Sequence, residues 1–595
     1  MKRTMALLLA LLFVVALFSG CGGNNASNAG GQTAATPAPS AAPKADEGNS
    51  GTAPESTPEP EPTEEPSPYH LAAGNFEKDD RGFPTAPYNY DQPLTTADES
   101  FTFWTSTFMN QYIPEEGMES LPVPMGMEEQ TGVHIEYMVV PWDTRSNNFA
   151  VMLASDDLPD ISAQGISYYS GTYYEAVSEG YFVNIHDYMD YCPNYIYQAT
   201  YNRDDLNTYE NIFYASDMII AFYNMCVTPF YTTNKVIRAD YLEQVGMNYR
   251  DVKTWDDWFN ALSAIKSQID KVEFPWPLTS SIEVKGSYCT SPSFETLGSM
   301  NAAGLPDYFI KDGKVTFGNL TENDKAFMQK MNEFYAAGLI DPNWRSYSSS
   351  MAFTAKTSNG EIAIMDMAAT EIDSTNATCV DPGCDWQGLS RPLLYEGQVL
   401  HVGGDLSRVT AGTGNSSVSG RCENIELAVS WCDYRYSPYG SDYNSYGPEG
   451  VIWEYDEAGK RTATQWALTH DMGYSWATMF FGLNSLFEHG LFDTSVKTIY
   501  DGGAKVDAIR AYWADYDYDG AYEVPAGCRM TADESDTVNS LSADIATYIS
   551  ENYSLFLTGE KSFDEWDDYV SAVFSMGMQE IIDTYQTAYD RYLAA

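Results

Sequence analysis

The stretch EEQTGVHIEYMVV, residues 128–140, carries the pattern that decides the fold. Val133, Ile135 and Tyr137 alternate with other residues, which places their side chains on one face of a β-strand. Gly132 stands directly before them, and glycine is the usual residue at the left-handed position that ends a helix. The stretch therefore predicts a helix that ends at Gly132 and leads straight into a strand.

Elements of the same two kinds are predicted on either side of this stretch. In ESFTFWTST, residues 99–107, Phe101 and Phe103 alternate with polar residues as they would in a strand. In RSNNFAVMLASDDLPDI, residues 145–161, apolar residues recur at helical spacing until the pattern breaks at Pro159. The order strand, helix, strand, helix, strand favours a parallel α/β sheet.

Two later segments begin with the signature of a capped helix. In KTWDDWFNALSAIK, residues 253–266, Thr254 can cap the helix together with Asp257 three residues further on. Ser562 and Glu565 repeat this arrangement near the C-terminus. Tryptophans follow both caps at helical spacing, and we expect these rings to form core and not a ligand site.

Taken in order along the chain, these segments resemble the extracellular solute-binding proteins of ABC importers, the class that includes maltose-binding protein. The resemblance to the LplA-like lipoprotein subgroup of that family is carried by further segments, and it runs from residue 101 to the C-terminus. These segments are VIRADYLEQVGMNYRDVKTWDDWFNALSAIK, IKDGKVTFGN, MNEFYAAGLIDPNW, YGPEGVIWEYDEAGK and FLTGEKSFDEWDDYVSAVFSMGMQEIIDTYQTAYDRY.

The resemblance implies an α/β protein of the type II periplasmic-binding-protein fold, with two lobes and a ligand cleft between them. The first crossing between lobes is expected near MCVTPFYTTN, residues 225–234, and the return near TSNGEIAIMDM, residues 357–367. The implied boundaries are 97–228 and 359–420 for the N-terminal lobe, and 229–358 and 421–595 for the C-terminal lobe.

The N-terminus, MKRTMALLLALLFVVALFSGC, has the layout of a bacterial secretory signal. Two basic residues precede an apolar core, which is too short for a comfortable permanent membrane span. Ser19 and Gly20 lead into Cys21, which resembles the lipobox of bacterial lipoproteins apart from Phe18, where that family usually has leucine. The resemblance implies that residues 1–20 are removed and that Cys21 carries a lipid. The alternative is an ordinary cleaved signal with an accidental cysteine.

Residues 21–96 are predicted to form a disordered linker. The segment is rich in Ala, Pro, Ser, Thr, Gly and Glu, as in TPAPSAAPKADEGNSGTAPESTPEPEPTEEPSP. Such a composition buries too little apolar surface to offset the entropy of an ordered chain. The linker would tether the folded part to a membrane through Cys21.

The overall composition excludes some partners. With 84 acidic and 32 basic residues the formal net charge is −52, which disfavours nucleic acids and anionic lipid surfaces because both are bound mainly through Lys and Arg. About 500 residues follow the signal and linker, which is too many for a single core. Cys21 aside, eight cysteines remain, and the pairs Cys379/Cys384 and Cys422/Cys432 are the simplest predictions for disulfides in an exported chain.

Six residues are expected at the ligand site because they follow strands or stand at the lobe crossings. An aromatic ring can lie against the apolar face of a sugar, and a carboxylate can accept hydrogen bonds from its hydroxyl groups. For each of the six, packing in the core is the competing interpretation. They are Trp104, Tyr168, Tyr231, Phe294, Asp366 and Trp453.

No metal or cofactor site is expected from the remaining motifs. The six histidines are scattered without paired spacing. The motif DYDYDG repeats the first half of a calcium loop with Asp515, Asp517 and Asp519, but its twelfth position is Ala526 where such a loop has a bidentate glutamate. Calcium is therefore a weak candidate, and an acidic surface turn is the simpler interpretation.

The sequence thus predicts a monomeric, lipid-anchored substrate-binding protein, not an enzyme and without a cofactor. It would capture an oligosaccharide or glycan fragment outside the cell membrane and deliver it to an ABC permease. Two alternatives stay open: a tethered, secreted glycan-cleaving enzyme, and a member of the same family that binds peptides.

Overall fold

The computed structural model describes residues 67–90, 93–107, 109–229, 231–282, 289–299, 304–404, 406–409, 414–482, 488–500 and 502–594. All of them belong to one compact unit within residues 66–595. The signal segment and Cys21 lie outside the described residues. Within the described ranges, no helix combines the length and apolar character needed to cross a bilayer.

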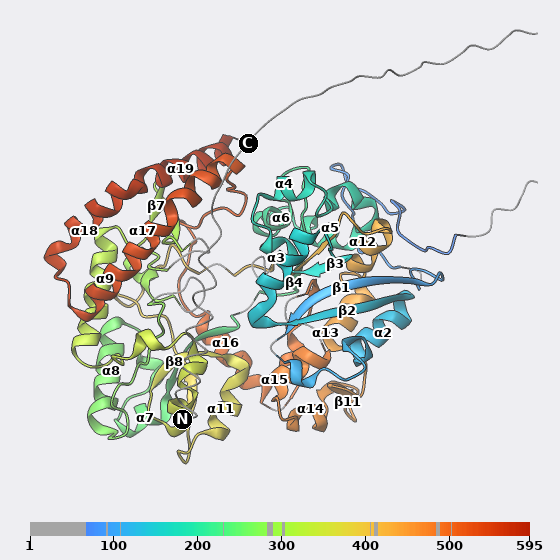
Figure 1. Cartoon of the computed structure of the whole chain (residues 1–595). Coiled ribbons are helices and arrows are strands. Elements are labelled where there is room, and N and C mark those ends of the chain that lie inside the picture. Colours follow the sequence, from blue (N-terminus) through green and yellow to red (C-terminus); the bar gives the residue numbers. More distant parts are fainter. Residues whose placement is uncertain are drawn as a thin grey trace, which may run out of the picture. The chain divides into compact units, whose positions relative to one another are not determined.

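The first lobe is built on a six-stranded sheet with the strand order β13-β4-β10-β3-β1-β2 (Figure 1). The central strand β1 runs parallel to β2 and β3, and β4 runs parallel to β13, while β10 is antiparallel to both its neighbours. The parallel α/β order predicted for the first strands is confirmed. The strands are β1 Glu99–Thr107, β2 Val133–Pro141, β3 Ile161–Ala163, β4 Phe222–Cys226, β10 Asn415–Val418 and β13 Gly490–Phe492.

Gly132 ends the first helix of this lobe, α2 Pro122–Thr131, as the sequence predicts. Its φ of +72° is left-handed, and its backbone N–H donates to the carbonyl oxygen of Glu128. A Cβ atom on Gly132 would stand 2.1 Å from the carbonyl oxygen of Thr95, so both the conformation and the space call for glycine.

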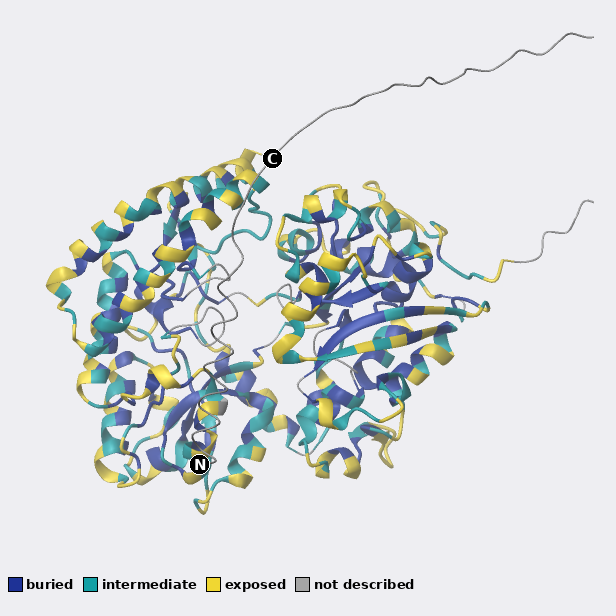
Figure 2. Ribbon diagram, viewed as in Figure 1, coloured by how far each residue is buried: buried dark blue, intermediate teal, exposed yellow. Residues whose placement is uncertain are grey.

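Helices cover both faces of the sheet. Neighbouring residues of a strand point to opposite faces: the Phe103 ring packs 6.0 Å from Trp431 of α12, and the Trp104 ring packs 4.9 Å from Phe149 of α3. Both strand residues are fully buried, and Figure 2 shows much of β1 in dark blue. The helices of this lobe are α2, α3 Arg145–Ser155, α4 Tyr173–Ser178, α5 Pro193–Thr200, α6 Leu206–Ile212, α12 Ile425–Tyr434, α13 Pro438–Tyr446, α14 Gln465–Thr469 and α15 Tyr474–Ala477, with the small hairpin β11 Trp453–Tyr455 and β12 Arg461–Ala463.

The second lobe holds a three-stranded antiparallel sheet, β8-β5-β9, and a helical core. The predicted capping box is present at α8: the Thr254 side chain accepts from the backbone N–H of Asp257, and the Asp257 carboxylate accepts from the backbone N–H of Thr254. Trp255 and Trp258, which follow this cap, are buried core residues as expected. The elements of this lobe are β5 Thr233–Arg238, β8 Ile364–Ala368, β9 Trp386–Gly388, the hairpin β6 Tyr308–Lys311 and β7 Lys314–Phe317, and helices α7 Ala239–Gln244, α8 Trp255–Gln268, α9 Glu322–Ala336, α10 Thr354–Asn359, α11 Ile372–Thr378, α16 Gly503–Trp513, α17 Ala532–Thr558, α18 Trp566–Val573 and α19 Gln579–Ala594.

The chain passes between the lobes three times. The first crossing lies between the end of β4 and the start of β5, inside the stretch where the sequence predicts it. The return predicted at residues 357–367 is wrong, because β8 pairs with β5 of the second lobe. Instead, Val402 packs in the second lobe and Val409 in the first, so the return lies between these residues. The third crossing lies between β13 and α16.

The predicted lobe boundaries therefore need correction in two places. Residues 359–402 belong to the second lobe, because their strands β8 and β9 flank β5. Residues 425–492 belong to the first lobe, because α12 packs in its core and β13 pairs with β4. The expectation fails because strand pairing across large sequence separations, and not the position along the chain, decides the lobe of each segment.

The predicted linker also extends too far. Ala72, Tyr90 and Leu94 are buried in the core of the first lobe, and the Tyr90 hydroxyl donates to Asp433 on α12 over 2.7 Å. The backbone between residues 67 and 96 is held by bonds such as the one from His70 N–H to the Leu94 carbonyl. The end of the predicted linker is thus part of the folded lobe.

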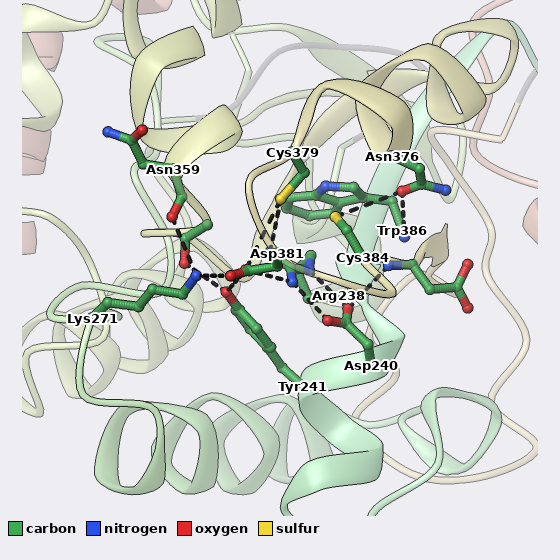
Figure 3. A network of polar contacts seen from close by, with 12 residues as sticks. Arg238, Asp240, Tyr241, Lys271, Asn359, Asn376, Cys379, Asp381, Cys384 and Trp386 are labelled. Atoms are coloured by element: carbon green, nitrogen blue, oxygen red, sulfur yellow. Dashed lines mark hydrogen bonds and ion pairs between the residues drawn. The ribbon is translucent and has the colours of Figure 1, made fainter.

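A polar network joins β5 to the loop after α11 in the second lobe (Figure 3). The buried Arg238 guanidinium donates to Asp240 over 2.6 and 2.8 Å and to Asp381 over 2.9 Å, while Tyr241 and Lys271 also donate to Asp381. Burial opposes ionisation of Asp381, but hydrogen bonds from Lys271, Tyr241 and Arg238 outweigh it and lower its pKa to about 2.

The eight cysteines of the described residues are all free, so neither predicted disulfide is formed. Cys379 and Cys384 lie beside the network of Figure 3, where Cys379 accepts from Arg238 and Cys384 donates to Asn376. Cys432 is fully buried in α12, and burial raises the pKa of its thiol well above the ordinary value. The short spacing of these cysteines in the sequence therefore does not lead to disulfide bonds in the structure.

Candidate functional site

A cleft of about 490 Å³ lies where the two lobes face each other. Most of its lining comes from the second lobe, and its opposite wall comes from the segment around α15 and from the third crossing. A groove of about 560 Å³ adjoins it and shares Ser350, Met367, Thr370, Glu371, Ser475 and Trp476 with it. The cleft is lined by Thr232, Thr233, Thr279, Ser281, Ser348, Ser349, Ser350, Phe353, Asp366, Met367, Ala368, Thr370, Glu371, Ser475, Trp476, Met479 and Lys497.

The floor of the cleft is formed by two antiparallel strands of the second lobe. The register places Thr233, at the start of β5, opposite Ala368, at the end of β8. Thr370 and Glu371 follow directly in the loop after β8. Because the first crossing enters the lobe at Thr233, this floor lies next to the chain segment that joins the lobes.

The opposite wall is built around Trp476 on α15. This short helix continues into a π-helical turn, Thr478–Gly482, a kind of helix often found at functional sites. Trp476 is partly exposed and packs beside a small cluster with Met109 and Phe480. The Ser475 hydroxyl donates to the Thr370 hydroxyl over 3.0 Å, which is a direct contact between the two walls.

Lys497 lines the same wall from the third crossing. It sits in the 3₁₀ turn Thr494–Thr498, which Asp493 caps by accepting from the backbone of Ser495. The Tyr474 hydroxyl donates to the carbonyl of Val496 over 2.7 Å and so holds this turn against α15. Lys497 is buried in this wall, with 6% of the residue exposed.

Two carboxyl groups lie on the cleft floor in different environments. The Asp366 carboxylate accepts from the Lys235 ammonium over 2.6 Å, and a third of its side chain is exposed. Burial raises the pKa of Glu371, against a smaller lowering by a backbone hydrogen bond at Ala368. The charge of Asp366 is therefore neutralised by its ion pair with Lys235, whereas burial favours the neutral form of Glu371.

Of the six predicted ligand residues, Asp366 alone lines the cleft. Tyr231 stands directly before the lining residues Thr232 and Thr233, but its ring is buried and its hydroxyl contacts Gly404 and Tyr516. Tyr231 thus lies behind the cleft wall, at the crossing where the sequence places it.

Trp104 is fully buried, and the expectation of a solvent-facing ring in the cleft is wrong. Its indole N–H donates to Asn148 over 2.8 Å, and its ring packs against Phe149 and Tyr168. Tyr168 is partly buried in the same aromatic group and donates to Gln164 over 2.8 Å. Because α3 covers the face of the sheet to which Trp104 points, the strand has no open face at this position.

Phe294 and Trp453 are also core residues. Phe294 packs 5.8 Å from Trp255 and 5.7 Å from Phe327 in the second lobe. The Trp453 indole donates to the carbonyl of Gly447 over 3.1 Å, and its ring lies under the Arg461 guanidinium. Neither residue is among those that line the cleft.

The sequence analysis missed the wall formed by Trp476 and Lys497. A signal is present in GYSWATMFFG, residues 473–482, where a tryptophan follows a glycine with a φ of +80°. Nothing in its spacing separates this tryptophan from the core tryptophans of α8, so only the fold distinguishes it. Lys497 carries no local signal, because its burial results from chain segments far apart in the sequence.

The motif DYDYDG is held by backbone hydrogen bonds to a neighbouring segment. Tyr518 pairs with Leu400 in a short parallel bridge, and the Asp519 carboxylate accepts from His401 over 2.8 Å. Across the part of the chain that the structure describes, no three His, Cys, Asp or Glu side chains are grouped so that they could hold a metal ion. The acidic segment is an edge of the second lobe.

Known proteins resemble this chain along most of its length. Residues 108–374 match the family model of the bacterial extracellular solute-binding protein. The chain is 23% identical over 523 residues to the fructooligosaccharide ABC transporter substrate-binding protein FusA of Streptococcus pneumoniae serotype 4 (strain ATCC BAA-334 / TIGR4), an alignment covering 81% of this chain and 88% of FusA.

Two solved structures share the fold. A solute-binding protein from Bifidobacterium longum infantis ATCC 15697, described as HMO-binding and ABC-transporter-associated, superposes with a TM-score of 0.64 at 16% identity and covers 83% of this chain and 99% of its own. The alginate-binding protein AlgQ2, solved without calcium ion, gives 0.63 at 18% identity and covers 84% and 99%. At these identities the structures establish a common two-lobed α/β architecture.

Proposed function

Because residues 108–374 match the family model of the bacterial extracellular solute-binding protein and the chain is similar to FusA along most of its length, we propose that it is a protein of this family, which binds an oligosaccharide in the cleft between its lobes and delivers it to an ABC importer. The observation that carries the proposal is the composition of the cleft, where hydroxyl-bearing Ser and Thr side chains surround the partly exposed ring of Trp476. Sugars present hydroxyl groups for hydrogen bonds and apolar C–H faces for aromatic rings, so this lining suits them. The relatives that bind sugars, FusA among them, support the same ligand class.

Replacing Trp476 tests this proposal. We expect Trp476→Ala to weaken glycan binding by about 1 to 3 kcal/mol, or about 5-fold to more than 100-fold in Kd, because the sugar loses an apolar platform. The measurement is a calorimetric titration with a fructo-oligosaccharide and a set of other neutral oligosaccharides, together with a melting curve for each variant.

Trp466→Ala is the matched control for that measurement. Trp466 is 45% exposed on α14, packs against His470 and Phe481, and does not line the cleft. Its replacement should leave Kd unchanged. If Trp476→Ala and the wild-type protein bound every glycan with equal affinity, the Trp476 ring would not be part of the ligand site.

The bound glycan would be passed to the transmembrane subunits of an ABC permease. Closing the cleft around the ligand changes the surface that the two lobes present together, so a permease can distinguish loaded from empty protein. The protein would act as a monomer and would release its glycan unaltered. A product in the mass spectrum that accumulates with purified protein would favour the glycan-cleaving alternative.

The protein would be held at the outer face of the cell membrane by a lipid on Cys21. The support is the lipobox-like end of the signal and the polar segment after it. Cys21→Ala should shift the protein from the membrane fraction to soluble or uncleaved forms in its natural host. An unchanged membrane fraction and an unchanged mature mass would contradict the anchor.

A further inference from the structure

Lys497 is a buried ammonium group in the cleft without an acidic partner. Its side chain is 6% exposed, and among the described residues no carboxylate lies within the 4.0 Å that defines an ion pair with it. The contact of its Nζ atom is the Met479 sulfur at 3.6 Å, a weak acceptor. The group is thus held at the cleft wall by packing and not by charge.

Such an arrangement is unfavourable in the empty protein. A buried charge destabilises a folded protein unless it is paired, and folded proteins normally supply the partner themselves. Burial and the nearby Arg510 lower the pKa of Lys497 to about 8, so the group is still mostly protonated at neutral pH. Arg510 stands in the last turn of α16, and its guanidinium is paired with Asp507 over 3.7 Å.

The acidic groups of the cleft do not neutralise Lys497. Asp366 is paired with Lys235 over 2.6 Å. Burial raises the pKa of Glu371, which favours its neutral form, and within the described ranges Glu371 forms no ion pair with Lys497. The overall charge of −52 repels anions at long range, so binding of an anion here would depend on local contacts with positive groups.

We infer that the cleft takes an acidic glycan, and that a carboxylate of a uronic or sialic acid unit pairs with the Lys497 ammonium. The inference rests on the proposed function and narrows its ligand class. The glycan carboxylate would form the ion pair with Lys497 that no described acidic residue forms. Trp476 and the hydroxyl-bearing residues would hold the sugar rings beside it. A charge-assisted hydrogen bond of this kind strengthens binding more than a neutral one.

Matched pairs of neutral and acidic glycans test the inference. The probes are galactotriose and trigalacturonate, mannotriose and trimannuronate, and lactose and sialyllactose, each titrated calorimetrically at one fixed salt concentration. We expect the acidic member of the best-binding pair to bind about 10-fold to 100-fold more tightly than its neutral counterpart.

Lys497→Met should abolish this preference, so that the acidic and the neutral member of a pair bind the variant with equal affinity. The melting temperature of the unliganded variant should rise, because a buried unpaired charge is replaced by an apolar chain of similar length. Lys497→Gln is the second variant should methionine disturb the fold. Lys253→Met is the control, since Lys253 is exposed, pairs with Glu396 and lies outside the cleft.

The outcomes separate this inference from the proposed function. Tighter binding of neutral glycans, or an acidic preference that persists in both Lys497 variants, would overturn the inference and leave glycan binding intact. Failure of all glycans to bind the wild-type protein would overturn the proposed function, and the inference would fall with it.

Discussion

At the scale of single residues, burial and partners decide what each side chain does. Trp104 and Trp476 are the same residue type, yet Trp104 is enclosed by α3 and Trp476 faces the cleft. Asp381 and Asp366 are both paired with lysines, but Asp381 belongs to a structural network and Asp366 to the cleft floor. Residue type alone therefore does not assign a role.

The network around Asp381 predicts a pH-dependent contribution to stability. The folded-state pKa of about 2 lies below the ordinary value of 3.8, so the ionised carboxylate stabilises the fold above about pH 4, and this contribution disappears as the pH falls toward 2. Asp381→Asn should lower the free energy of unfolding at neutral pH by about 2 kcal/mol. Urea denaturation at several pH values measures the difference between the two proteins.

The difference between wild type and Asp381→Asn should shrink between pH 4 and pH 2. Asp256→Asn is the control, because Asp256 is 85% exposed and pairs with Lys330 at the surface, where ion pairs contribute little. A constant difference across the acid range would mean that the carboxylate charge is not what stabilises the network.

At the scale of elements, the segment from residue 67 to 96 behaves as part of the first lobe. Unlike the linker before it, this segment contains aromatic residues. Leu94 and Ala72 have no exposed surface, and Tyr90 reaches the buried Asp433. Burial raises the pKa of Asp433 to about 6, against hydrogen bonds from Tyr195, Tyr90 and Asn194. The segment therefore contributes both apolar contacts and a donor to the core.

Leu94→Ala tests whether this segment is structural. Removing a fully buried leucine side chain should cost about 2 to 5 kcal/mol of the free energy of unfolding. Leu593→Ala, at a leucine that is 63% exposed on α19, should cost almost nothing. If Leu94→Ala and Leu593→Ala had equal stability, residues 67–96 would belong to the predicted linker and not to the folded lobe.

At the scale of the whole molecule, three chain crossings join two lobes that each have a core of their own. The Ser475–Thr370 hydrogen bond bridges the cleft walls, and Glu210 of the first lobe accepts from the Gly527 backbone and from the Tyr592 hydroxyl of the second lobe. Polar contacts of this kind can be exchanged for others when the lobes move at the crossings, which suits a protein that opens and closes around a ligand.

Closure should be visible in solution scattering. A glycan that binds the wild-type protein should lower its radius of gyration, since the ligand favours the closed state. The Trp476→Ala variant, at a ligand concentration that leaves it unloaded, should keep the radius of the empty protein. Binding by calorimetry without any change in the wild-type radius would show that the cleft takes its ligand without closure.

The sequence by itself predicted the α/β class, the helix end at Gly132, the capped helix after Thr254 and the first crossing. These features depend on neighbours in the chain: alternation along a strand, a left-handed glycine, and a side chain bonding to its own helix end. The tertiary structure alone decided the lobe of residues 425–492, the burial of Trp104 and the position of Lys497 and Trp476 at one cleft. Each of these depends on which distant segment covers a given face, and strand pairing across hundreds of residues leaves no local pattern in the sequence.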